Sequence, residues 1–427
     1  MATSQPIVDQ HAEQPARTRA LAKPNVAYIM SRFPKLSETF VLYEMLALQQ
    51  QGVGVEAFPL INERAKVIHA EAKQFVERAH YLPVLSLAIM LANLHFLLKR
   101  PLAYLGTWLA VLRGTFGSTN YMIGGLGIIP KATKFAYDMQ RMGVTHVHAH
   151  FANHPTVAAL VVHRLTGIPF SFTAHAHDLY VDQHMLAEKV RAAKFVVAIS
   201  QYNKELIVKH AGEAMREKIQ VVHCGVDTRL FQPRPQPSAG GPFTIVCVGS
   251  LEEKKGQTYL IEACRILKGR GLNFACHLIG DGDCRPALEA QVARDGLGDV
   301  VRLAGGRPRD EVLKMLATAD VVALPSIRTK SGKMEGIPVA LMEPLACEVP
   351  VVSTRTSGIP ELVEEGVTGL LVPPENPQAL ADALERLAHD PELGRRMGRA
   401  GREKVLREFD LTDNTARLAQ LMIGGPR

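Results

Sequence analysis

The chain has 427 residues, of which 47% are hydrophobic and 21% are charged. This balance excludes a wholly disordered or collagen-like chain, and the length predicts two or three globular domains. The net charge of +7 is unevenly placed, because residues 1–232 hold 24 Lys/Arg against 16 Asp/Glu, whereas residues 233–427 hold 25 against 26. A basic first half suits an anionic partner such as a nucleic acid, an acidic membrane surface or a phosphorylated substrate.

The six cysteines form no Cys-x-x-Cys pair, and residues 1–24 lack the apolar core of a secretory signal. We therefore expect reduced thiols, a cytoplasmic location and a flexible tail at 1–24. One stretch, residues 81–98, is about as long and apolar as a membrane span, but Pro83, Asn93 and His95 interrupt it. A buried helix, or a helix lying on a membrane surface, is the expectation there.

The first predicted element is the apolar run 25–30, which is typical of a buried parallel strand. A proline-bearing loop follows, then a helix from about Glu38 to Gln51, and then a strand at 53–58. Residues 64–142 have a mostly helical pattern and form an insertion. The alternation of strands and helices resumes with strands at 145–150, 170–173, 195–199 and 220–223.

The proline-rich stretch 233–242 is the best candidate for a linker between domains. After it, a second series of strands is predicted at 244–248, 275–279, 300–303, 321–324 and 349–353, with helices between them. The sequence therefore predicts an α/β protein with two doubly wound domains, 25–232 and 243–405. The cleft between them, at the carboxyl ends of the strands, is the expected ligand site.

The most specific segment is EGIPVALMEPLACEVP, at residues 335–350. Glu335 and Glu343 are separated by seven residues, Gly336 allows backbone to approach a ligand closely, and Pro338 suits the start of a helix. The free N–H groups of such a helix start are a good place for a pyrophosphate.

This segment, continued to residue 374, strongly resembles the signature of family 4 glycosyltransferases, which have the GT-B fold. The resemblance extends to residues 221–233, 246–256, 277–282 and 319–326, in the order found in the family. Three segments of the first half, 31–45, 146–159 and 171–180, are similar to the colanic-acid type of bacterial exopolysaccharide glycosyltransferase. The resemblance implies two Rossmann-like domains facing a cleft, with the helical insertion in the first, and a last helix, here 406–427, that crosses back to the first domain.

The resemblance implies transfer of a sugar from a UDP- or GDP-sugar with retention of configuration, without a metal or another cofactor. Glu343 would bind the ribose of the donor, Glu335 would lie at the donor sugar, and Lys255 would neutralise the phosphates. The other expected donor-binding residues are Gly249, Ser250, Lys254, Gly280, Gly336, Ile337 and Pro338. Ser250 stands where many members have arginine, so Lys254 or Arg328 could supply the missing cation.

His175 follows an apolar strand in the segment FTAHAHD, which predicts a place at the carboxyl end of that strand, facing the cleft. The resemblance puts it beside the anomeric carbon of the donor sugar, whereas a loop histidine bonded to backbone is the alternative. Asp178 would orient His175 or bind acceptor hydroxyls, and His177 is a weaker candidate. The remaining acceptor-side candidates are His150 and the helix start Ser37, Glu38 and Thr39, for which a plain helix cap is the alternative.

His146, His148 and His150 alternate, so they share one face of a regular strand. Together with His175 and His177 they could suggest a zinc hydrolase, but the chain lacks a convincing downstream set of ligands, and no metal is expected.

We therefore expect a retaining hexosyltransferase of bacterial exopolysaccharide biosynthesis that uses a lipid-linked saccharide acceptor and no nucleic acid. The basic first half and the apolar region 81–129 suggest peripheral association with the inner face of the plasma membrane. The alternatives are a soluble synthase acting on a free sugar, a catalytically silent sugar-nucleotide-binding protein and the zinc hydrolase.

Overall fold

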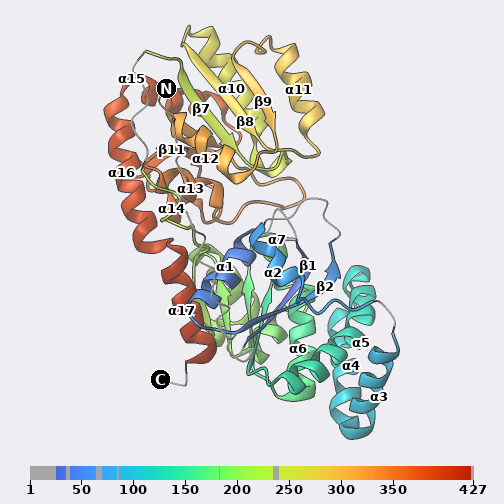
Figure 1. Cartoon of the computed structure of the whole chain (residues 1–427). Coiled ribbons are helices and arrows are strands. Elements are labelled where there is room, and N and C mark those ends of the chain that lie inside the picture. The colour runs from blue at the N-terminus through green and yellow to red at the C-terminus, as the bar shows by residue number, and fades with distance from the viewer. Residues whose placement is uncertain are drawn as a thin grey trace, which may run out of the picture.

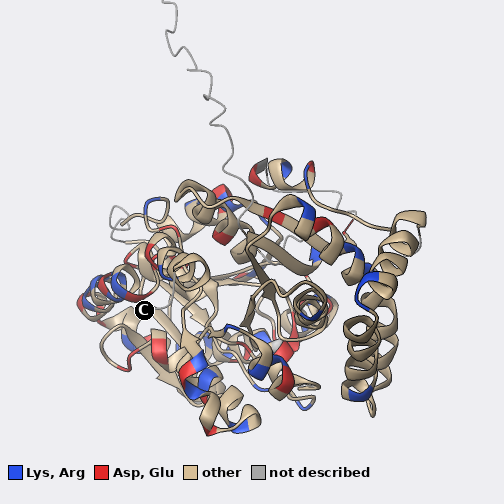
Figure 2. Ribbon diagram, turned by 90° about the horizontal axis from the view of Figure 1, so that it is seen from below, with Lys and Arg blue, Asp and Glu red and all other residues tan. Residues whose placement is uncertain are grey.

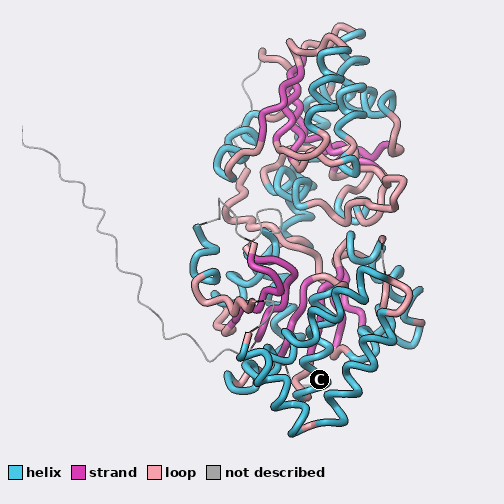
Figure 3. The backbone as a smooth tube through the Cα atoms, turned by 90° about the vertical axis from the view of Figure 1, so that its right-hand side faces the viewer, coloured by secondary structure: helices cyan, strands magenta, loops and turns pink. Residues whose placement is uncertain are grey.

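The computed structural model describes residues 26–34, 39–63, 70–83, 86–181, 183–233 and 240–424. The predicted tail at 1–24 lies outside these ranges, as does most of the predicted linker at 233–242. Two six-stranded parallel sheets form two lobes, one above the other, with loops where the lobes meet (Figures 1 and 3). The predicted α/β fold class, two doubly wound domains with a helical insertion in the first, is confirmed.

The first sheet has the strand order β2-β1-β3-β4-β5-β6. Its strands are β1 Val26–Phe33, β2 Val55–Asn62, β3 His146–His150, β4 Phe170–Ala174, β5 Phe195–Ala198 and β6 Ile219–Val221. The strand order reverses between β1 and β3, and sheets of this kind usually bind ligands at the carboxyl ends of the strands beside such a reversal.

The second sheet has the strand order β12-β11-β10-β7-β8-β9. Its strands are β7 Phe243–Val248, β8 Phe274–Ile279, β9 Val301–Gly305, β10 Val321–Leu324, β11 Val351–Thr354 and β12 Gly369–Val372. The reversal here lies between β7 and β10. β12 was not among the predicted strands, because its four residues begin with a glycine and give no clear strand pattern.

Helices fill the connections between the strands in both lobes. Those of the first lobe are α1 Thr39–Gln50, α2 Lys73–Val76, α3 Leu87–Lys99, α4 Pro101–Thr115, α5 Thr119–Met142, α6 His154–Thr166, α7 His177–Tyr180, α8 Leu186–Ala192 and α9 Gln201–Ala211, with 3-10 turns at Ala70–Ala72 and Glu213–Lys218. Those after the linker are α10 Gln257–Gly269, α11 Arg285–Arg294, α12 Arg309–Thr318, α13 Val339–Ala346, α14 Ile359–Leu362, α15 Pro377–His389, α16 Pro391–Glu408 and α17 Leu411–Ile423, with a 3-10 turn at Glu253–Lys255.

The first sheet is covered on both faces, so β3 and β4 are fully buried although apolar and polar residues alternate along them. Successive residues of β1 point to opposite faces, so Ala27 and Ile29 join one core cluster, whereas Tyr28 and Met30 join another. The face that carries Tyr28 is covered by α1 and α17. The second lobe has one large core cluster built on β7 to β12.

The last two helices run along one side of the molecule and link the lobes (Figure 1). α16 packs in the second lobe, and α17 lies against α1 in the first. Leu418 and Met422 of α17 belong to the core cluster that contains Val41 and Met45 of α1. The chain thus crosses back to the first lobe at its end.

The insertion between β2 and β3 contains three longer helices, α3, α4 and α5, which stand together at the outer edge of the first lobe (Figure 1). The predicted helix at 81–98 begins only at Leu87, because the side chain of Ser86 caps it by accepting a hydrogen bond from the N–H of Ile89 at 3.2 Å.

Candidate functional site

The second lobe brings two backbone loops together at the reversal point of its sheet. The loop after β7, residues 249–256, lies against the loop after β8, and the two are in backbone contact. A Cβ atom on Gly280, whose φ is +147°, would lie 1.9 Å from the carbonyl oxygen of Gly249, so only glycine fits there. The loop that follows β10 passes the same point and ends at α13.

Two lysines and one glutamate meet between these loops. Lys255 Nζ lies 2.9 Å from Glu335 Oε2, and Lys254 Nζ lies 3.1 Å from Glu335 Oε1. Burial opposes ionisation of Glu335, but the two lysines outweigh it and hold the pKa of this carboxyl below its ordinary value. Burial likewise opposes the charge on Lys254, but Glu335 and Glu252 outweigh it and raise the lysine pKa. Glu335 and Lys254 are therefore charged near neutral pH.

Gly336 brings this cluster against the first lobe. A Cβ atom on Gly336 would lie 2.7 Å from Ile199 Cδ1 and 3.6 Å from Ala176 Cβ, so the absence of a side chain permits the close approach. Ser357 Oγ donates a hydrogen bond to the carbonyl oxygen of Gly336 at 3.0 Å. Because Ala176 follows His175, the predicted residues Glu335 and His175 lie on backbone segments that face each other across the two lobes. Ile337 is buried in the second core, and Pro338 precedes the first residue of α13.

Glu343 lies further along α13, close to an arginine of the second lobe and a tyrosine of the first. Burial raises the pKa of Glu343 to about 7, and the charge of Arg309 acts in the opposite direction. The guanidinium of Arg309 lies 4.4 Å from the ring centre of Tyr43 on α1 and 5.0 Å from that of Phe231. These contacts link α12 and α1 across the lobes.

On the first lobe, His175 directly follows β4 and is 6% exposed. Its ring centre lies 4.8 Å from that of Phe40 and 4.7 Å from that of Phe151. Burial lowers its pKa well below the ordinary value, and the neighbouring His150 adds to this. The ring is therefore neutral near pH 7.

Asp178 holds the backbone around His175 rather than its ring. The carboxylate accepts hydrogen bonds from the N–H of His175, at 3.0 and 3.1 Å, and from the N–H of Ala152. Burial raises the pKa of Asp178 to about 6, although these backbone donors oppose the shift. At 3% exposed, the side chain is enclosed by the turn that it supports, and its hydrogen bonds orient the segment that carries His175.

The three alternating histidines share one face of β3, as predicted, and their partners lie mainly on β4. His146 Nε2 and His148 Nδ1 each lie within 2.8 Å of Ser171 Oγ, and His148 Nε2 lies 2.9 Å from Thr173 Oγ1. His150 Nδ1 lies 3.2 Å from His175 Nε2, and His150 Nε2 lies 3.0 Å from Glu44 Oε1. His150 is fully buried and bonded to His175, so in this structure it does not face the cleft as an acceptor-binding residue.

One grouping of potential metal ligands occurs within the described residues, formed by Glu44, His148 and His150, whose ligand atoms lie within 4.8 Å of one another. Both ring nitrogens of each histidine already have hydrogen-bond partners in the protein. We therefore treat this cluster as a hydrogen-bond network.

The other predicted site residues are placed as follows. Ser37 and Glu38 lie outside the described residues, and Thr39 is the half-buried first residue of α1. Ser250 lies in the loop after β7, where its carbonyl oxygen accepts a hydrogen bond from Gln257 Nε2 at 2.9 Å. Of the two cations considered as replacements for an arginine at that position, Lys254 contacts Glu335, whereas Arg328 is solvent-exposed.

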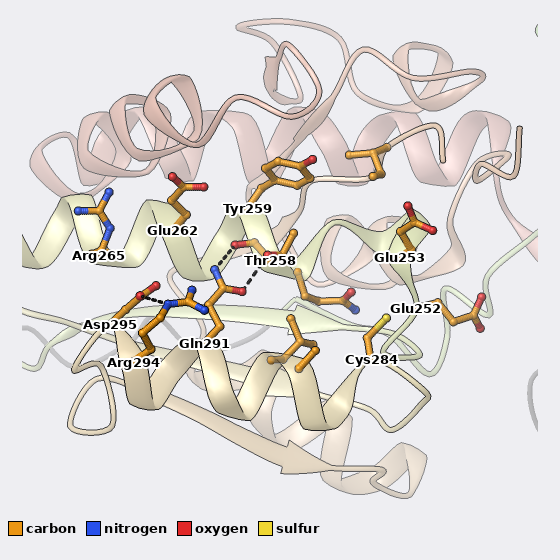
Figure 4. A pocket seen from close by; sticks show the side chains of 14 residues that line it. Glu252, Glu253, Thr258, Tyr259, Glu262, Arg265, Cys284, Gln291, Arg294 and Asp295 are labelled. Atoms are coloured by element: carbon orange, nitrogen blue, oxygen red, sulfur yellow. Dashed lines mark hydrogen bonds and ion pairs between the residues drawn. The ribbon is translucent and has the colours of Figure 1, made fainter. Parts of the chain in front are cut away.

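A well-formed pocket lies beside this site but does not contain it. The groove is lined by α10 and α11, and Glu252 and Glu253 of the loop after β7 stand at one end (Figure 4). Glu335, Lys255 and His175 do not line it. Within the groove, Thr258 bonds to Gln291 and Arg294 pairs with Asp295 (Figure 4).

Sequence reasoning missed several residues that shape the site. Tyr43 and Arg309 lie at the lobe interface, and so does Glu361, whose carboxylate accepts hydrogen bonds from the first N–H groups of α9, including that of Tyr202 at 2.9 Å. Glu44 lies within the first lobe, where it contacts His150. Glu44 and Tyr43 fall within the segment 31–45, which the sequence comparison had marked. Nothing local to Arg309 or Glu361 indicates a partner in the other lobe.

Comparison with known proteins places the chain among sugar-transferring enzymes. A family model described as "Glycosyl transferases group 1" matches residues 228–404, and one described as "Glycosyltransferase Family 4" matches residues 110–230. The chain is 44% identical over 209 residues to the putative colanic acid biosynthesis glycosyltransferase WcaL of Escherichia coli K12, a match that covers 48% of this chain and 51% of WcaL. The chain thus spans about half the length of that relative.

A second relative is matched over more of its length. The GDP-mannose-dependent alpha-(1-6)-phosphatidylinositol monomannoside mannosyltransferase of Mycobacterium tuberculosis is 31% identical over 267 residues, which cover 59% of this chain and 69% of that protein. Among solved structures, HepE of Anabaena in complex with UDP has a TM-score of 0.69 at 18% identity, covering 93% of this chain and 98% of that chain. This last likeness shows a shared fold.

Proposed function

The chain belongs to glycosyltransferase family 4 and has the GT-B fold, and from this premise we propose that it transfers a sugar from a UDP- or GDP-sugar to a saccharide acceptor in bacterial exopolysaccharide biosynthesis. The colanic acid relative supports the biosynthetic context. The HepE complex with UDP and the GDP-mannose-dependent relative support a nucleotide sugar as donor.

The observation that carries the proposal is the cluster of Lys254, Lys255 and Glu335 at the reversal point of the second sheet. In such a transfer the leaving group is a nucleoside diphosphate, so negative charge develops on its phosphate oxygens. One buried and one partly exposed lysine, both held in place by the same carboxylate, would stabilise that charge without reorganising during the reaction. They would supply the charge that a divalent cation supplies in other phosphate sites, which favours transfer without a metal.

The position of His175 opposite this cluster supports a donor sugar lying between the lobes. Gly336 passes so close to Ala176 that a Cβ atom on it would lie 3.6 Å from Ala176 Cβ, so a sugar attached to a diphosphate at Lys255 would reach the turn that carries His175. In the retaining reaction that we propose, the acceptor hydroxyl attacks from the side of the departing phosphate, which takes its proton. Neither a metal nor a side-chain base is part of this scheme.

The test is a panel of UDP- and GDP-sugars, each assayed with and without EDTA for binding, for slow donor hydrolysis and for transfer. We expect one donor to raise the melting temperature and to be hydrolysed equally well in EDTA, and the transfer product to keep the anomeric configuration of the donor. Binding without turnover would instead favour the catalytically silent protein, for which Ser250, in place of the usual arginine, gives some support. Transfer to a free sugar without any lipid would favour the soluble synthase.

We further propose that the acceptor is linked to a lipid and that the enzyme meets it on an anionic membrane. The support is an exposed apolar face on α3, α4 and α5, at the edge of the first lobe. Among the described residues, large apolar side chains that are exposed concentrate there: Leu87, Met90, Leu91, Leu94, Leu97, Leu98, Leu102, Leu105, Leu109, Phe116, Met122, Ile123 and Leu126. Leu102 is 88% exposed and Phe116 81%, which is unusual for a surface facing only water.

The charge of this region fits an anionic surface. Residues 78–137 contain six Lys/Arg and no Asp/Glu, and the three helices are drawn almost without charged segments in Figure 2. Lys131 is not available to a lipid, because it donates to the carbonyl oxygens of Leu60 and Leu82 at 2.7 and 3.0 Å. Lys99 and Arg113, in contrast, are exposed beside the apolar face. Apolar contact flanked by cations is the pattern of helices that lie on anionic membranes.

No helix within the described ranges combines the length and apolar content required to cross a bilayer. The membrane proposal is tested by sedimentation with vesicles of phosphatidylcholine alone or with added phosphatidylglycerol. We expect binding to the anionic vesicles at low salt and weaker binding as salt rises. No binding to anionic vesicles at low salt would remove the support for a membrane-presented acceptor while leaving the donor chemistry open.

A further inference from the structure

We propose that a pocket between the start of α4 and the end of α6 binds the phosphate group of an anionic phospholipid that is not the acceptor substrate. This inference rests on the membrane association proposed above and deepens it. It adds a second binding site, separate from the cleft, and names the residues that recognise its ligand.

The α4–α6 pocket has a volume of about 370 Å³ and is formed by two segments that are distant in the sequence. Arg100, Leu102 and Gly106 line it from α4 and the residue before that helix, and Arg164 lines it from the last turn of α6. Arg100 joins the two segments, because its Nη1 donates a hydrogen bond to the carbonyl oxygen of Leu165 at 3.0 Å. This bond holds one cation in place beside the pocket.

The charge around the pocket favours an anion. Arginine stays protonated throughout the physiological pH range, so Arg100 and Arg164 are both cations. Arg164 is exposed, and its guanidinium makes no hydrogen bond or ion pair with the part of the chain that the structure describes. Residues 78–177 contain eight Lys/Arg and a single acid, Asp138, which Lys134 already contacts at 2.6 Å. Among the described residues that line the pocket, none is acidic.

Gly106 leaves space in the pocket that packing within the protein does not require. Glycine is unfavourable in the interior of a helix, and Gly106 lies inside α4. A Cβ atom on Gly106 would have no atom of a neighbouring described segment within 4 Å. No packed neighbour therefore demands a glycine here, whereas a ligand in the pocket would gain room from the missing side chain.

The pocket also adjoins the exposed apolar face of the three-helix insertion. Leu102 lines the pocket and is 88% exposed, and Leu98 and Leu105 beside it in the sequence are exposed as well. A phospholipid matches both parts, because its phosphate oxygens can accept hydrogen bonds from the arginines while its acyl chains contact the leucines. Inorganic phosphate would use only the first part.

The pocket lies at the opposite end of the first sheet from the cleft. α6 ends at Thr166, before the amino end of β4, whereas His175 directly follows the carboxyl end of that strand. The five residues of β4 span about 16 Å. A sugar attached directly to a phosphate at Arg164 would therefore not reach His175, so the lipid bound here is an anchor rather than the acceptor.

The direct test needs no membrane. Water-soluble dihexanoyl phosphatidylglycerol, kept below its micelle concentration, is titrated into the full-length protein by calorimetry, and dihexanoyl phosphatidylcholine and inorganic phosphate are titrated separately. We expect saturable binding of phosphatidylglycerol, and at least about tenfold weaker binding of the other two, since one carries a cation beside its phosphate and the other lacks acyl chains. No saturable binding of phosphatidylglycerol, or equally tight binding of either of the others, overturns the proposal.

Two substitutions locate the binding in this pocket. Arg164→Gln removes a cation that has no described protein partner, so the affinity for phosphatidylglycerol should fall about tenfold, the size of one charge-assisted hydrogen bond. Gly106→Gln fills part of the pocket and should weaken binding severalfold. Because Arg164 is exposed and glutamine forms helices better than glycine, neither change should lower the melting temperature much.

Each substitution has a matched control outside the pocket. Arg113→Gln removes an exposed arginine near the other end of α4, and Gly127→Gln changes a glycine of α5 whose Cβ atom would also meet open space. Both controls should bind soluble phosphatidylglycerol as wild type does. If the pocket variants bind it as tightly as their controls, the site is not the α4–α6 pocket and the proposal is overturned.

Vesicles then connect the pocket to the membrane. Arg164→Gln and Arg113→Gln lose the same charge, so a protein attracted only by its overall charge would bind phosphatidylglycerol vesicles equally well in both forms. We expect Arg164→Gln to bind them severalfold more weakly than Arg113→Gln. Equal vesicle binding by these two variants, or no vesicle binding by wild type, overturns the anchoring role.

The outcomes separate this inference from the proposed sugar transfer. Neither the titration nor vesicle sedimentation depends on turnover. If wild type turns over a donor but does not bind soluble phosphatidylglycerol, only the lipid site is lost. If wild type turns over none of the donors, the proposed transfer fails, whereas the titration still decides whether the pocket binds a lipid phosphate.

Discussion

Lys255 Nζ lies 2.9 Å from Glu335 Oε2, although the two residues are 80 positions apart in the sequence. They come from loops on either side of the point where the order of the second sheet reverses, between β7 and β10. Both residues are only 9% exposed, so the ion pair between them is largely shielded from water. A diphosphate that binds here would meet a lysine side chain that Glu335 already holds in position.

Replacing Lys255 by alanine is expected to reduce turnover at least about 100-fold, because one of the two cations facing the leaving group is lost. Stability should fall by only about 1–3 kcal/mol, since Lys254 remains as a partner for Glu335. Steady-state kinetics and thermal unfolding measure the two effects. Lys268→Ala, which removes an exposed ion pair with Asp299, should change neither by much. Wild-type turnover in Lys255→Ala would contradict the assigned role.

The fold was largely predictable because buried parallel strands leave a simple signature. The run VVAL at 321–324 was predicted with its observed bounds, since every residue is apolar and Asp320 and Pro325 flank it. β12 gave no such signal. The helix before Gly52 was predicted to start at about Glu38, and α1 begins at Thr39.

The site was predictable only where its chemistry lies in one motif. Glu335 and Gly336 stand together in the sequence, so their importance could be inferred. The contact between Glu44 and His150 could not be predicted, because the two residues are 106 positions apart in the sequence and meet only when α1 packs on the sheet. The alternation at 146–150 predicted one shared face, but the hydroxyls of Ser171 and Thr173 that bond to it depend on the register between β3 and β4.

Membrane binding should depend on the apolar face of α3 and α4. Changing Leu98, Leu102 and Leu105 together to serine is expected to weaken binding to anionic vesicles at least about tenfold, because each leucine contributes about 1.5–3 kcal/mol when fully buried in lipid. These residues are exposed, so the melting temperature should stay near that of wild type. Vesicle sedimentation measures the effect, and Leu230→Ser with Leu406→Ser is the matched control on exposed leucines elsewhere. Equal vesicle binding by both variants would show that this face is not the membrane-binding surface.

The alignment of the two lobes should also depend on Glu361. Its carboxylate on α14 accepts from the N–H groups of Gln201 and Tyr202 at 2.8 and 2.9 Å, so it caps α9 of the opposite lobe. Glu361→Ala is expected to lower kcat/KM severalfold and stability by about 1 kcal/mol, while affinity for free UDP or GDP stays the same. Glu289→Ala, which removes an exposed ion pair within the second lobe, serves as control. An unchanged kcat/KM would show that this cap does not help to align the site.

Donor affinity should rise with pH through neutrality because of Glu343. Burial raises its pKa to about 7, so it is mostly protonated at pH 6 and mostly ionised at pH 8. If the carboxylate accepts hydrogen bonds from the ribose hydroxyls, a sugar nucleotide, whose diester phosphates stay ionised throughout, should bind severalfold more tightly at pH 8. Calorimetric titration measures this, and Glu343→Gln should bind equally at both pH values.

The same pKa makes an independent prediction about stability. An unfolded glutamate ionises near its ordinary value, whereas folded Glu343 keeps its proton to about pH 7. Between those values the folded state binds more protons, so its stability falls as pH rises through the window. Glu343→Gln does not ionise, so it should be about 1–3 kcal/mol more stable than wild type at pH 8, with this advantage lost near pH 4.5. Denaturant unfolding at both pH values measures it, and an equal difference at the two would show that Glu343 is not the group that titrates.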